Sequence, residues 1–372
     1  MFDWDVFVIG GGPAGLACAI AARRKGFRVA LADGQKPPID KACGEGLMSE
    51  AVQAASDIGI ALPPGFPLRG IRFHSGGASI QAGFPPGKWL AIRRTVLHQA
   101  LADEAESSGV ELRWETPVSG IERNSIRMAG GSASARWIIG TDGAGSRVRK
   151  WADLDHGSVG RRFGVRRHYA VEPWTDFVEV HWGSDFQIYV TPMACSEVCI
   201  ALISRDPHRR IDPSLECFPE LKSRLAGAPI LTSDRGGASF SRRLNKIYRG
   251  PVALLGDASG SVDAITGEGI CLAFQQAQAL ARALVSGGLS SYHAVHERLM
   301  RRPRLMSGIL LTLDRHPALR TRVFEAMSAN PDLFARMLAA HVGAAPLRDL
   351  AGTGLALGFQ ISARSLSLRR AL

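Results

Sequence analysis

The 372-residue sequence predicts an α/β fold in which a βαβ opening unit is interleaved with a mostly antiparallel sheet and followed by C-terminal helices. Three observations predict this arrangement. They are a glycine-rich turn between a strand pattern and a helix pattern near the N-terminus, a block of closely spaced strand-like runs, and helical periodicity toward the C-terminus. Because the chain exceeds one typical domain, we expect two interleaved lobes.

The opening unit begins with an apolar, β-branched run at residues 5–9. A helical pattern follows over residues 13–25, and a second strand-like run over residues 27–32. Between the first strand and the helix stands Gly-Gly-Gly-Pro-Ala-Gly at residues 10–15. A strand, a tight turn, a helix and a second strand in this order form a βαβ unit.

The turn has the G-x-G-x-x-G spacing of a Rossmann-type dinucleotide site. Gly10 permits the tight turn, Gly12 lets the backbone approach a pyrophosphate, and Gly15 lets the helix pack closely on the strand. The helix N-terminus offers free amides to phosphate. Asp33 follows the second strand, where an acidic residue binds ribose hydroxyls. The pattern predicts a nucleotide site and leaves FAD and NAD both open.

The middle of the chain contains strand-like runs at residues 163–171, 177–182, 187–191 and 198–203. Their connections are too short for crossover helices, so we expect a mostly antiparallel sheet. From residue 291 onward the pattern is helical, and we expect prolines to break it at Pro303, Pro317, Pro331 and Pro346.

These patterns divide the chain into three parts. A discontinuous nucleotide-binding domain contains residues 1–68, 90–160 and 245–290. A β-sheet domain that covers the substrate contains residues 69–89 and 161–244. A C-terminal helical region contains residues 291–372.

Composition describes an ordinary globular protein with 46% hydrophobic and 21% charged residues. The formal charge of +11 suits anionic cofactors or an anionic membrane surface, but the dispersed basic residues argue against nucleic acid. Without a basic leader or an apolar run near the ~18 residues of a membrane span, we expect a cytoplasmic protein. Six cysteines lack metal spacing, so we expect reduced thiols and no metal site: Cys18, Cys43, Cys195, Cys199, Cys217 and Cys271.

Two later segments favour FAD over NAD as the cofactor. Trp-Ile-Ile-Gly-Thr-Asp-Gly-Ala-Gly-Ser-Arg-Val-Arg at residues 137–149 resembles the D-G motif of class A flavin monooxygenases and their relatives. Val-Ala-Leu-Leu-Gly-Asp-Ala at residues 252–258 resembles the G-D motif of the same superfamily, whose aspartate, here Asp257, binds the ribityl hydroxyls of FAD. Both motifs suit this role, because an apolar strand delivers one carboxylate to a polyol.

The chain therefore resembles the FAD-dependent superfamily of aromatic hydroxylases, geranylgeranyl reductases and flavin halogenases. Lys-Ala-Cys-Gly-Glu-Gly at residues 41–46 and Thr-Gly-Glu-Gly-Ile at residues 266–270 are most similar to segments of the geranylgeranyl reductase branch near the isoalloxazine ring. The helix start at residues 93–98 is similar to one in which an arginine meets FAD, a role that we give to Arg94 first and Arg93 second.

The resemblance implies a para-hydroxybenzoate hydroxylase-like architecture with FAD as the bound cofactor. Where the family usually has a proline in the loop over the flavin, this chain has Ala264, which leaves the substrate pose open. With the glycine-rich turn, the motifs give the predicted FAD-binding residues: Gly10, Gly12, Pro13, Ala14, Gly15, Asp33, Cys43, Gly44, Arg94, Asp142, Gly143, Gly256, Asp257, Gly267, Gly269 and Ile270.

Two residues of these motifs keep alternative interpretations. Cys43 is favoured as a packing or turn residue over a redox thiol, because no second cysteine lies close in sequence. Glu45 either touches FAD or caps the helix that follows.

Candidate substrate-pocket residues lie on the strands expected to cover the flavin. Alternation places Glu179 and His181 on one face of their strand, with Val178, Val180 and Trp182 on the other, and leaves open which face looks inward. The candidates are His168, Tyr169, Glu179, His181, Tyr189 and Pro192.

The resemblance favours an NAD(P)H-dependent monooxygenase that hydroxylates a hydrophobic aromatic, polyketide or isoprenoid-like metabolite after oxygen adds at flavin C4a. The alternatives are reduction of prenyl double bonds, halogenation, and a flavin-binding sensor without turnover. The small hydrophobic substrate, the choice of NADH or NADPH, the catalytic residues and the oligomeric state stay open. The helix around Arg298, Arg301, Arg302 and Arg304 either closes the substrate cavity or forms a basic surface for lipid headgroups.

Overall fold

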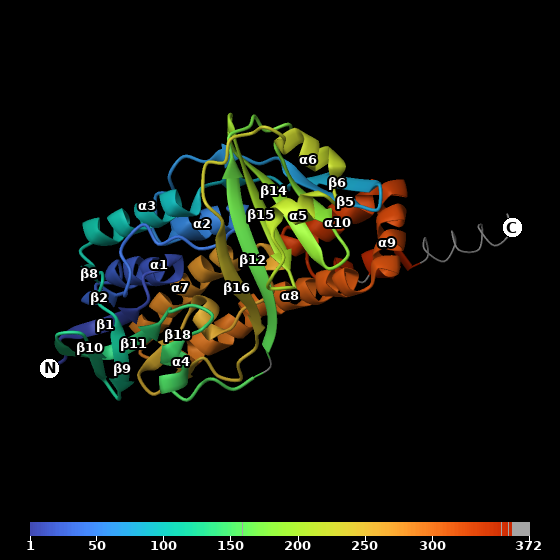
Figure 1. Ribbon diagram of the computed structural model, residues 1–372. Helices are drawn as coiled ribbons and strands as arrows, with labels where there is room; N and C mark the ends of the chain where they lie inside the picture. Colours follow the sequence, from blue (N-terminus) through green and yellow to red (C-terminus); the bar gives the residue numbers. More distant parts are fainter. Residues whose placement is uncertain (158, 351, 356, 359–372) are drawn as a thin grey trace, which may run out of the picture.

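The computed structural model describes residues 1–372 except 158, 351, 356 and 359–372 (Figure 1). The last part of the expected C-terminal helical region, residues 359–372, therefore lies outside the described residues. The N-terminal elements gather on one side of the molecule and α9 and α10 on the other, with a second sheet between them.

The first sheet contains the opening unit and has the strand order β17-β18-β11-β1-β2-β8. The antiparallel hairpin of β9 and β10 joins it outside this order, where β10 pairs with β11. The sheet's central strands run parallel, and β1, which has a strand on each side, is buried from Val6 to Ile9. The bounds are β1 Trp4–Ile9, β2 Val29–Ala32, β8 Glu111–Arg113, β9 Val118–Glu122, β10 Ser125–Met128, β11 Gly131–Gly140, β17 Tyr248–Arg249 and β18 Val252–Leu254.

Three helices pack against one another on this sheet: α1 (Pro13–Arg23) contacts both α3 (Arg94–Ser107) and α7 (Gly269–Ser286). Because α1 is almost wholly buried and five of its eleven residues are alanine, it can lie close to its neighbours. Short elements complete this part of the molecule: α2 Ser49–Asp57, α4 Arg147–Trp151, η1 Gly256–Ser259, η2 Ala264–Thr266, and a small sheet of β3 Gly46–Leu47, β7 Leu90–Ala91 and β4 Phe66–Pro67.

The second sheet has the order β16-β12-β15-β14-β13-β5-β6 and is antiparallel except where β13 pairs with β5. The prediction of a mostly antiparallel sheet is thus confirmed. Its strands are β5 Gly70–Ser75, β6 Ala78–Gly83, β12 Val159–Tyr169, β13 Phe177–Trp182, β14 Phe186–Ala194, β15 Glu197–Ser204 and β16 Arg235–Arg242.

Each face of the second sheet belongs to a different core. The outer face packs under the short helices α5 (Ile211–Leu215) and α6 (Pro219–Leu225). The inner face carries Val180 and Trp182 and packs against the C-terminal helices. On β13, the apolar side chains therefore face inward, and Glu179 and His181 face outward.

The C-terminal helices are α8 (Leu289–Arg315), α9 (Pro317–Ala329) and α10 (Pro331–His341). Pro317 and Pro331 begin helices, as expected of a residue that lacks a backbone donor. The expected break at Pro303 is wrong, because α8 runs through this residue. Pro303 is buried, and the packing of α8 on α7 and η2 offsets the lost backbone hydrogen bond.

Candidate functional site

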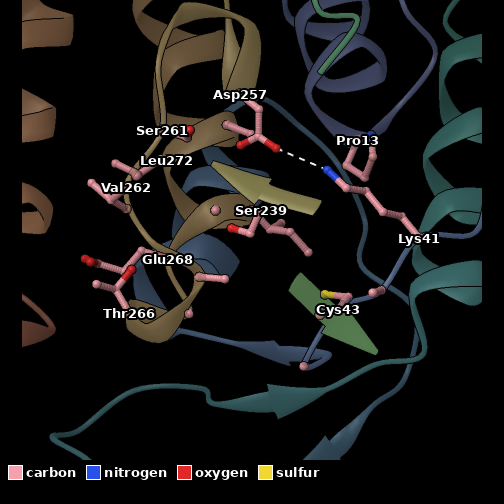
Figure 2. A pocket seen from close by; sticks show the side chains of 18 of the residues that line it. Pro13, Lys41, Cys43, Ser239, Asp257, Ser261, Val262, Thr266, Glu268 and Leu272 are labelled. Carbon is pink, nitrogen blue, oxygen red and sulfur yellow. Dashed lines mark hydrogen bonds and ion pairs between the residues drawn. The ribbon is translucent and has the colours of Figure 1, made fainter. Parts of the chain in front are cut away.

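A cavity of about 830 Å³ opens at the carboxyl ends of β1, β2 and β11 and extends to residues of the second sheet, α8 and α10. In parallel α/β sheets, ligands bind at this edge. Figure 2 shows Lys41 and Cys43 facing Val262, Thr266 and Glu268 across the pocket. Its lining includes these predicted FAD-binding residues: Gly10, Gly12, Pro13, Ala14, Asp33, Cys43, Gly44, Arg94, Asp142, Gly143, Gly256, Asp257, Gly267, Gly269 and Ile270.

The glycines of the first turn serve different purposes. Gly10 has a φ of +112°, and an added Cβ would lie 2.6 Å from the Thr141 backbone. Gly15 lies beneath the turn, where an added Cβ would lie 1.9 Å from the Gly10 carbonyl oxygen. An added Cβ at Gly12 would meet no atom within 4 Å. Protein atoms therefore leave no room for a side chain at Gly10 or Gly15, whereas Gly12 faces the open cavity.

The ends of the first two strands hold the turn in place. The backbone N–H of Gly11 donates to Asp33 Oδ2 at 2.6 Å, and that of Gln35 donates to Asp33 Oδ1 at 2.8 Å. The buried imidazole of His98, on α3, is hydrogen-bonded through Nε2 to the Gly11 carbonyl oxygen at 2.8 Å. Asp33 thus aligns the turn as well as lining the cavity.

The two later aspartates differ in their surroundings. Asp142 accepts the backbone N–H groups of Arg147 and Val148 at 2.7 and 3.1 Å, and so fixes the loop before α4. Asp257 is about 40% exposed in its side chain and has Lys41 Nζ 3.3 Å from its Oδ2 (Figure 2). Its carboxylate faces the cavity, as binding to a polyol requires.

The segment at residues 41–46 is tied down by Glu45, which has a φ of +60° and is buried. Its Oε1 accepts the backbone N–H of Arg94, the first residue of α3, at 2.9 Å. Its Oε2 lies 2.6 Å from His168 Nε2. Glu45 therefore caps a helix, but this is α3, 49 residues later, and not the helix that follows in sequence.

These residues fit FAD. Gly12 leaves space at the N-terminus of α1, whose first turn has no side-chain cap, so its amides are available to a pyrophosphate. Arg94 lines the cavity with a buried Nε that has no hydrogen-bond partner among the described residues. Asp33 and Asp257 supply carboxylates for hydroxyl groups. Arg93 instead donates to Glu197 at 2.6 Å.

The part of the cavity lined by Gly12, Asp33, Arg94 and Asp257 is called here the cradle for FAD. Beyond it, the cavity continues as an apolar chamber. Phe73 packs against Phe334 and Trp182, with ring centroids 5.2 and 5.9 Å apart. The Tyr189 hydroxyl donates to the Ile265 carbonyl oxygen at 3.0 Å, so this polar group is already satisfied. The chamber wall includes Phe73, Val178, Trp182, Met306, Leu310 and Phe334.

Of the six candidate substrate-pocket residues, Tyr189 lines the chamber. Glu179 and His181 lie on the outer face, where Glu179 accepts from Arg72 and Trp174 at 2.9 Å. These two residues therefore leave the substrate-pocket prediction, because the alternation that puts Val178 in the chamber turns them away from it. They form an outer polar cluster with His74, whose ring stacks on His181 at 4.4 Å.

The other three candidates also lie outside the cavity lining of the described residues. His168 is on the inner face but is engaged by Glu45. Tyr169 packs in the outer core, where its hydroxyl accepts from Arg167 at 3.0 Å. Pro192 is buried on β14, next to a shift in strand register.

A buried network that the sequence did not reveal holds the loop in which Ala264 replaces proline. Asp263 caps η2 by accepting the backbone N–H of Ile265 at 3.0 Å. The Asp263 carboxylate also pairs with the buried Arg162 at 3.2 Å, and Arg162 donates to Gln187 at 2.5 Å. Side-chain contacts therefore define this loop without the proline. Arg162 and Asp263 are 101 residues apart, so no local pattern indicates the pair.

Glu268 is the buried carboxyl group of the same loop, and its Oε2 has no hydrogen-bond partner among the described residues. Burial raises the pKa of Glu268 to about 8, against the attraction of Arg302, whose Nη2 lies 4.0 Å away. Nearby His341 is hydrogen-bonded to the Thr266 carbonyl oxygen, and burial lowers its pKa to about 4. Glu268 is therefore protonated at neutral pH.

This burial predicts a pH-dependent stability. The folded chain binds the Glu268 proton more tightly than the unfolded chain, so the free energy of unfolding should fall as pH rises from about 5 to about 8. Glu268→Gln removes that loss. We expect the melting temperature of the variant without cofactor to exceed that of the unmodified chain increasingly across this range, as measured by scanning fluorimetry. A constant difference between the two curves would contradict the assignment.

The fold is that of solved flavin-dependent oxygenases and halogenases, and the cavity has residues that fit FAD. The chain belongs to the family described as "FAD binding domain", which matches residues 3–288.

Relatives of known name match most of the chain. The menaquinone reductase of Mycolicibacterium smegmatis is 26% identical over 328 residues, covering 80% of each chain. AqdB2 of Rhodococcus erythropolis, named a probable 2-heptyl-3-hydroxy-4(1H)-quinolone synthase, is 29% identical, covering 81% of this chain and 85% of its own. The digeranylgeranylglycerophospholipid reductase of Methanocaldococcus jannaschii is 23% identical, covering 73% and 74%.

Solved structures share the fold. The flavin-dependent brominase Bmp2 superposes with a TM-score of 0.78 at 19% identity over 99% of both chains. The 2-methyl-3-hydroxypyridine-5-carboxylic acid oxygenase superposes with a TM-score of 0.72 at 22% identity, covering 91% of this chain and 95% of its own.

Proposed function

We propose that the protein is an FAD-dependent reductase that saturates a carbon–carbon double bond in the prenyl chain of a lipophilic substrate, with NAD(P)H as reductant. The observation that carries this proposal is the continuity of the cavity. One space of about 830 Å³ joins the cradle for FAD to the apolar chamber. A prenyl chain has no polar groups, so it matches a wall of aromatic and aliphatic side chains.

Each part of the site has a role in this reaction. Bound FAD, once reduced, would supply a hydride to one carbon of the double bond, and the protonated carboxyl of Glu268, which lines the same cavity, would supply a proton to the other carbon. The turn at Gly12 and the carboxylates of Asp33 and Asp257 hold the cofactor, while the apolar chamber binds the substrate and excludes water. The protein's own contribution is therefore binding, orientation, a dry environment and a proton donor.

The names of the relatives support this reaction over hydroxylation. The menaquinone reductase and the digeranylgeranylglycerophospholipid reductase both match more than 70% of the chain. The segments around Cys43 and Glu268 resemble the geranylgeranyl reductase branch, and both line the cavity.

Hydroxylation is the second candidate. It is favoured by the relative named as a quinolone synthase, which has the higher identity of 29%. A fused aromatic ring with an alkyl tail would also fit the chamber beside Phe73 and Trp182.

Oxygen distinguishes the two reactions. We expect the holoprotein, reduced with NADPH or dithionite under strictly anaerobic conditions, to be reoxidised by a prenylated quinone or prenyl lipid and to yield a product with two added hydrogen atoms. Mass spectrometry identifies the product, and a sample of Gly12→Val protein without FAD serves as control. A product that forms only with O₂ and contains one of its oxygen atoms would establish hydroxylation instead.

A further inference from the structure

The outer side of α8 contains a second, basic groove of about 700 Å³. Four arginines line it: Arg298, Arg301 and Arg304 from α8, and Arg243 from the segment after β16. Spacings of three residues place the first three on one side of the helix. Leu305, which is 46% exposed, and Leu347 add apolar surface.

The groove has more positive than negative charge, with four arginines and one glutamate in its lining. Arg304 forms a double hydrogen bond with Glu297, the one carboxylate of the lining, at 2.8 and 3.0 Å. Arg243, Arg298 and Arg301 are exposed and have no acidic partner within the part of the chain that the structure describes. Three free guanidinium groups around one hollow favour an anion with several oxygen atoms, and phosphate is such an anion.

The groove is also close to the chamber. Met306 and Leu310 line the chamber from α8, while Leu305, next to Met306, faces outward beside the arginines. This stretch of the helix, from Arg298 to Leu310, therefore presents apolar side chains to the chamber on one side and basic side chains with an exposed leucine on the other. A basic surface with an exposed apolar side chain is the pattern of interfacial membrane binding.

We propose that this groove docks the protein on a bilayer of anionic phospholipid, with Arg243, Arg298 and Arg301 on headgroup phosphates and Leu305 against the acyl boundary. The docking stands on the groove alone. Its purpose rests on the proposed function, because a prenyl lipid dissolves in the bilayer and the chamber must receive it from there. Both interpretations of α8 left open by the sequence then hold, on opposite sides of the helix.

The test is co-sedimentation of the FAD-loaded protein with vesicles of phosphatidylcholine, with and without phosphatidylglycerol. We expect binding that requires phosphatidylglycerol, weakens with salt, and falls at least ~10-fold in Arg298→Glu/Arg301→Glu, at roughly 1 kcal/mol per basic residue. The matched control is Arg123→Glu/Arg127→Glu, which changes two exposed arginines in the β9–β10 hairpin near the N-terminus (Figure 1). It should bind like the unmodified protein.

Several results would overturn the proposal: no binding, equal binding to both kinds of vesicle, or an equal loss in the control pair. Retained vesicle binding together with loss of NADPH binding in the groove variant would assign the groove to the nucleotide instead. Turnover separates docking from the reaction. With detergent-solubilised substrate, Arg298→Glu/Arg301→Glu should turn over substrate as fast as the unmodified protein. If neither the unmodified protein nor any variant turned over substrate in detergent, the result would count against the proposed function, and the sedimentation result would be unaffected.

Discussion

Gly12→Val is expected to yield a folded protein that binds FAD at least ~100-fold more weakly, a loss of about 2.7 kcal/mol of binding free energy. An added Cβ at this position meets no atom within 4 Å, so the chain without cofactor should tolerate the side chain. The valine would instead occupy the space at the N-terminus of α1 that a pyrophosphate needs. Titration with FAD, followed by flavin fluorescence, measures the loss.

Gly15→Ala is the matched control for this prediction. There an added Cβ would lie 1.9 Å from the Gly10 carbonyl oxygen, so the fold itself should suffer. We expect unchanged thermal stability for the first variant and a markedly lower melting temperature for the second, both measured without cofactor. Tight FAD binding by Gly12→Val would refute the placement of the pyrophosphate.

The second large effect concerns the chamber. Val178→Trp should reduce turnover of a prenyl substrate at least ~100-fold while FAD binding changes little, because the new ring fills space beside Trp182 and Phe73 that the substrate needs. The flavin spectrum and the dissociation constant of FAD should stay close to those of the unmodified protein. Anaerobic reoxidation of the reduced flavin by substrate gives the rate.

Val285→Trp provides the comparison for the chamber variant, since Val285 is 61% exposed on α7 and its replacement adds no bulk to the cavity. It should keep full turnover. If Val178→Trp turned over substrate as fast as this control, the chamber would not be the substrate site.

The sequence predicted the site best where the functional residues lie close together along the chain. The turn from Gly10 to Gly15, Asp33 beyond the second strand, and the segment around Asp257 each combine a strand, a turn and a carboxylate within a short stretch. Such local patterns specify backbone shape directly, since only glycine tolerates a φ of +112° or a 1.9 Å approach. For this reason the structure brings these residues to one cavity as expected.

Contacts between distant segments were beyond the reach of the sequence. Alternation paired Glu179 with His181, but only the packing of β13 on the C-terminal helices decides which face looks inward. Glu45 meets Arg94 and His168 across 49 and 123 residues. Pro303 was expected to end a helix, yet tertiary packing outweighs this local preference.

Heat should release the bound cofactor from the purified protein. We expect chromatography to identify FAD at one molecule per chain, and the stripped protein to regain its absorbance near 450 nm, typical of an oxidised flavin, when FAD is supplied. A protein that stays colourless in excess FAD would contradict the assignment of the cavity and every role derived from it.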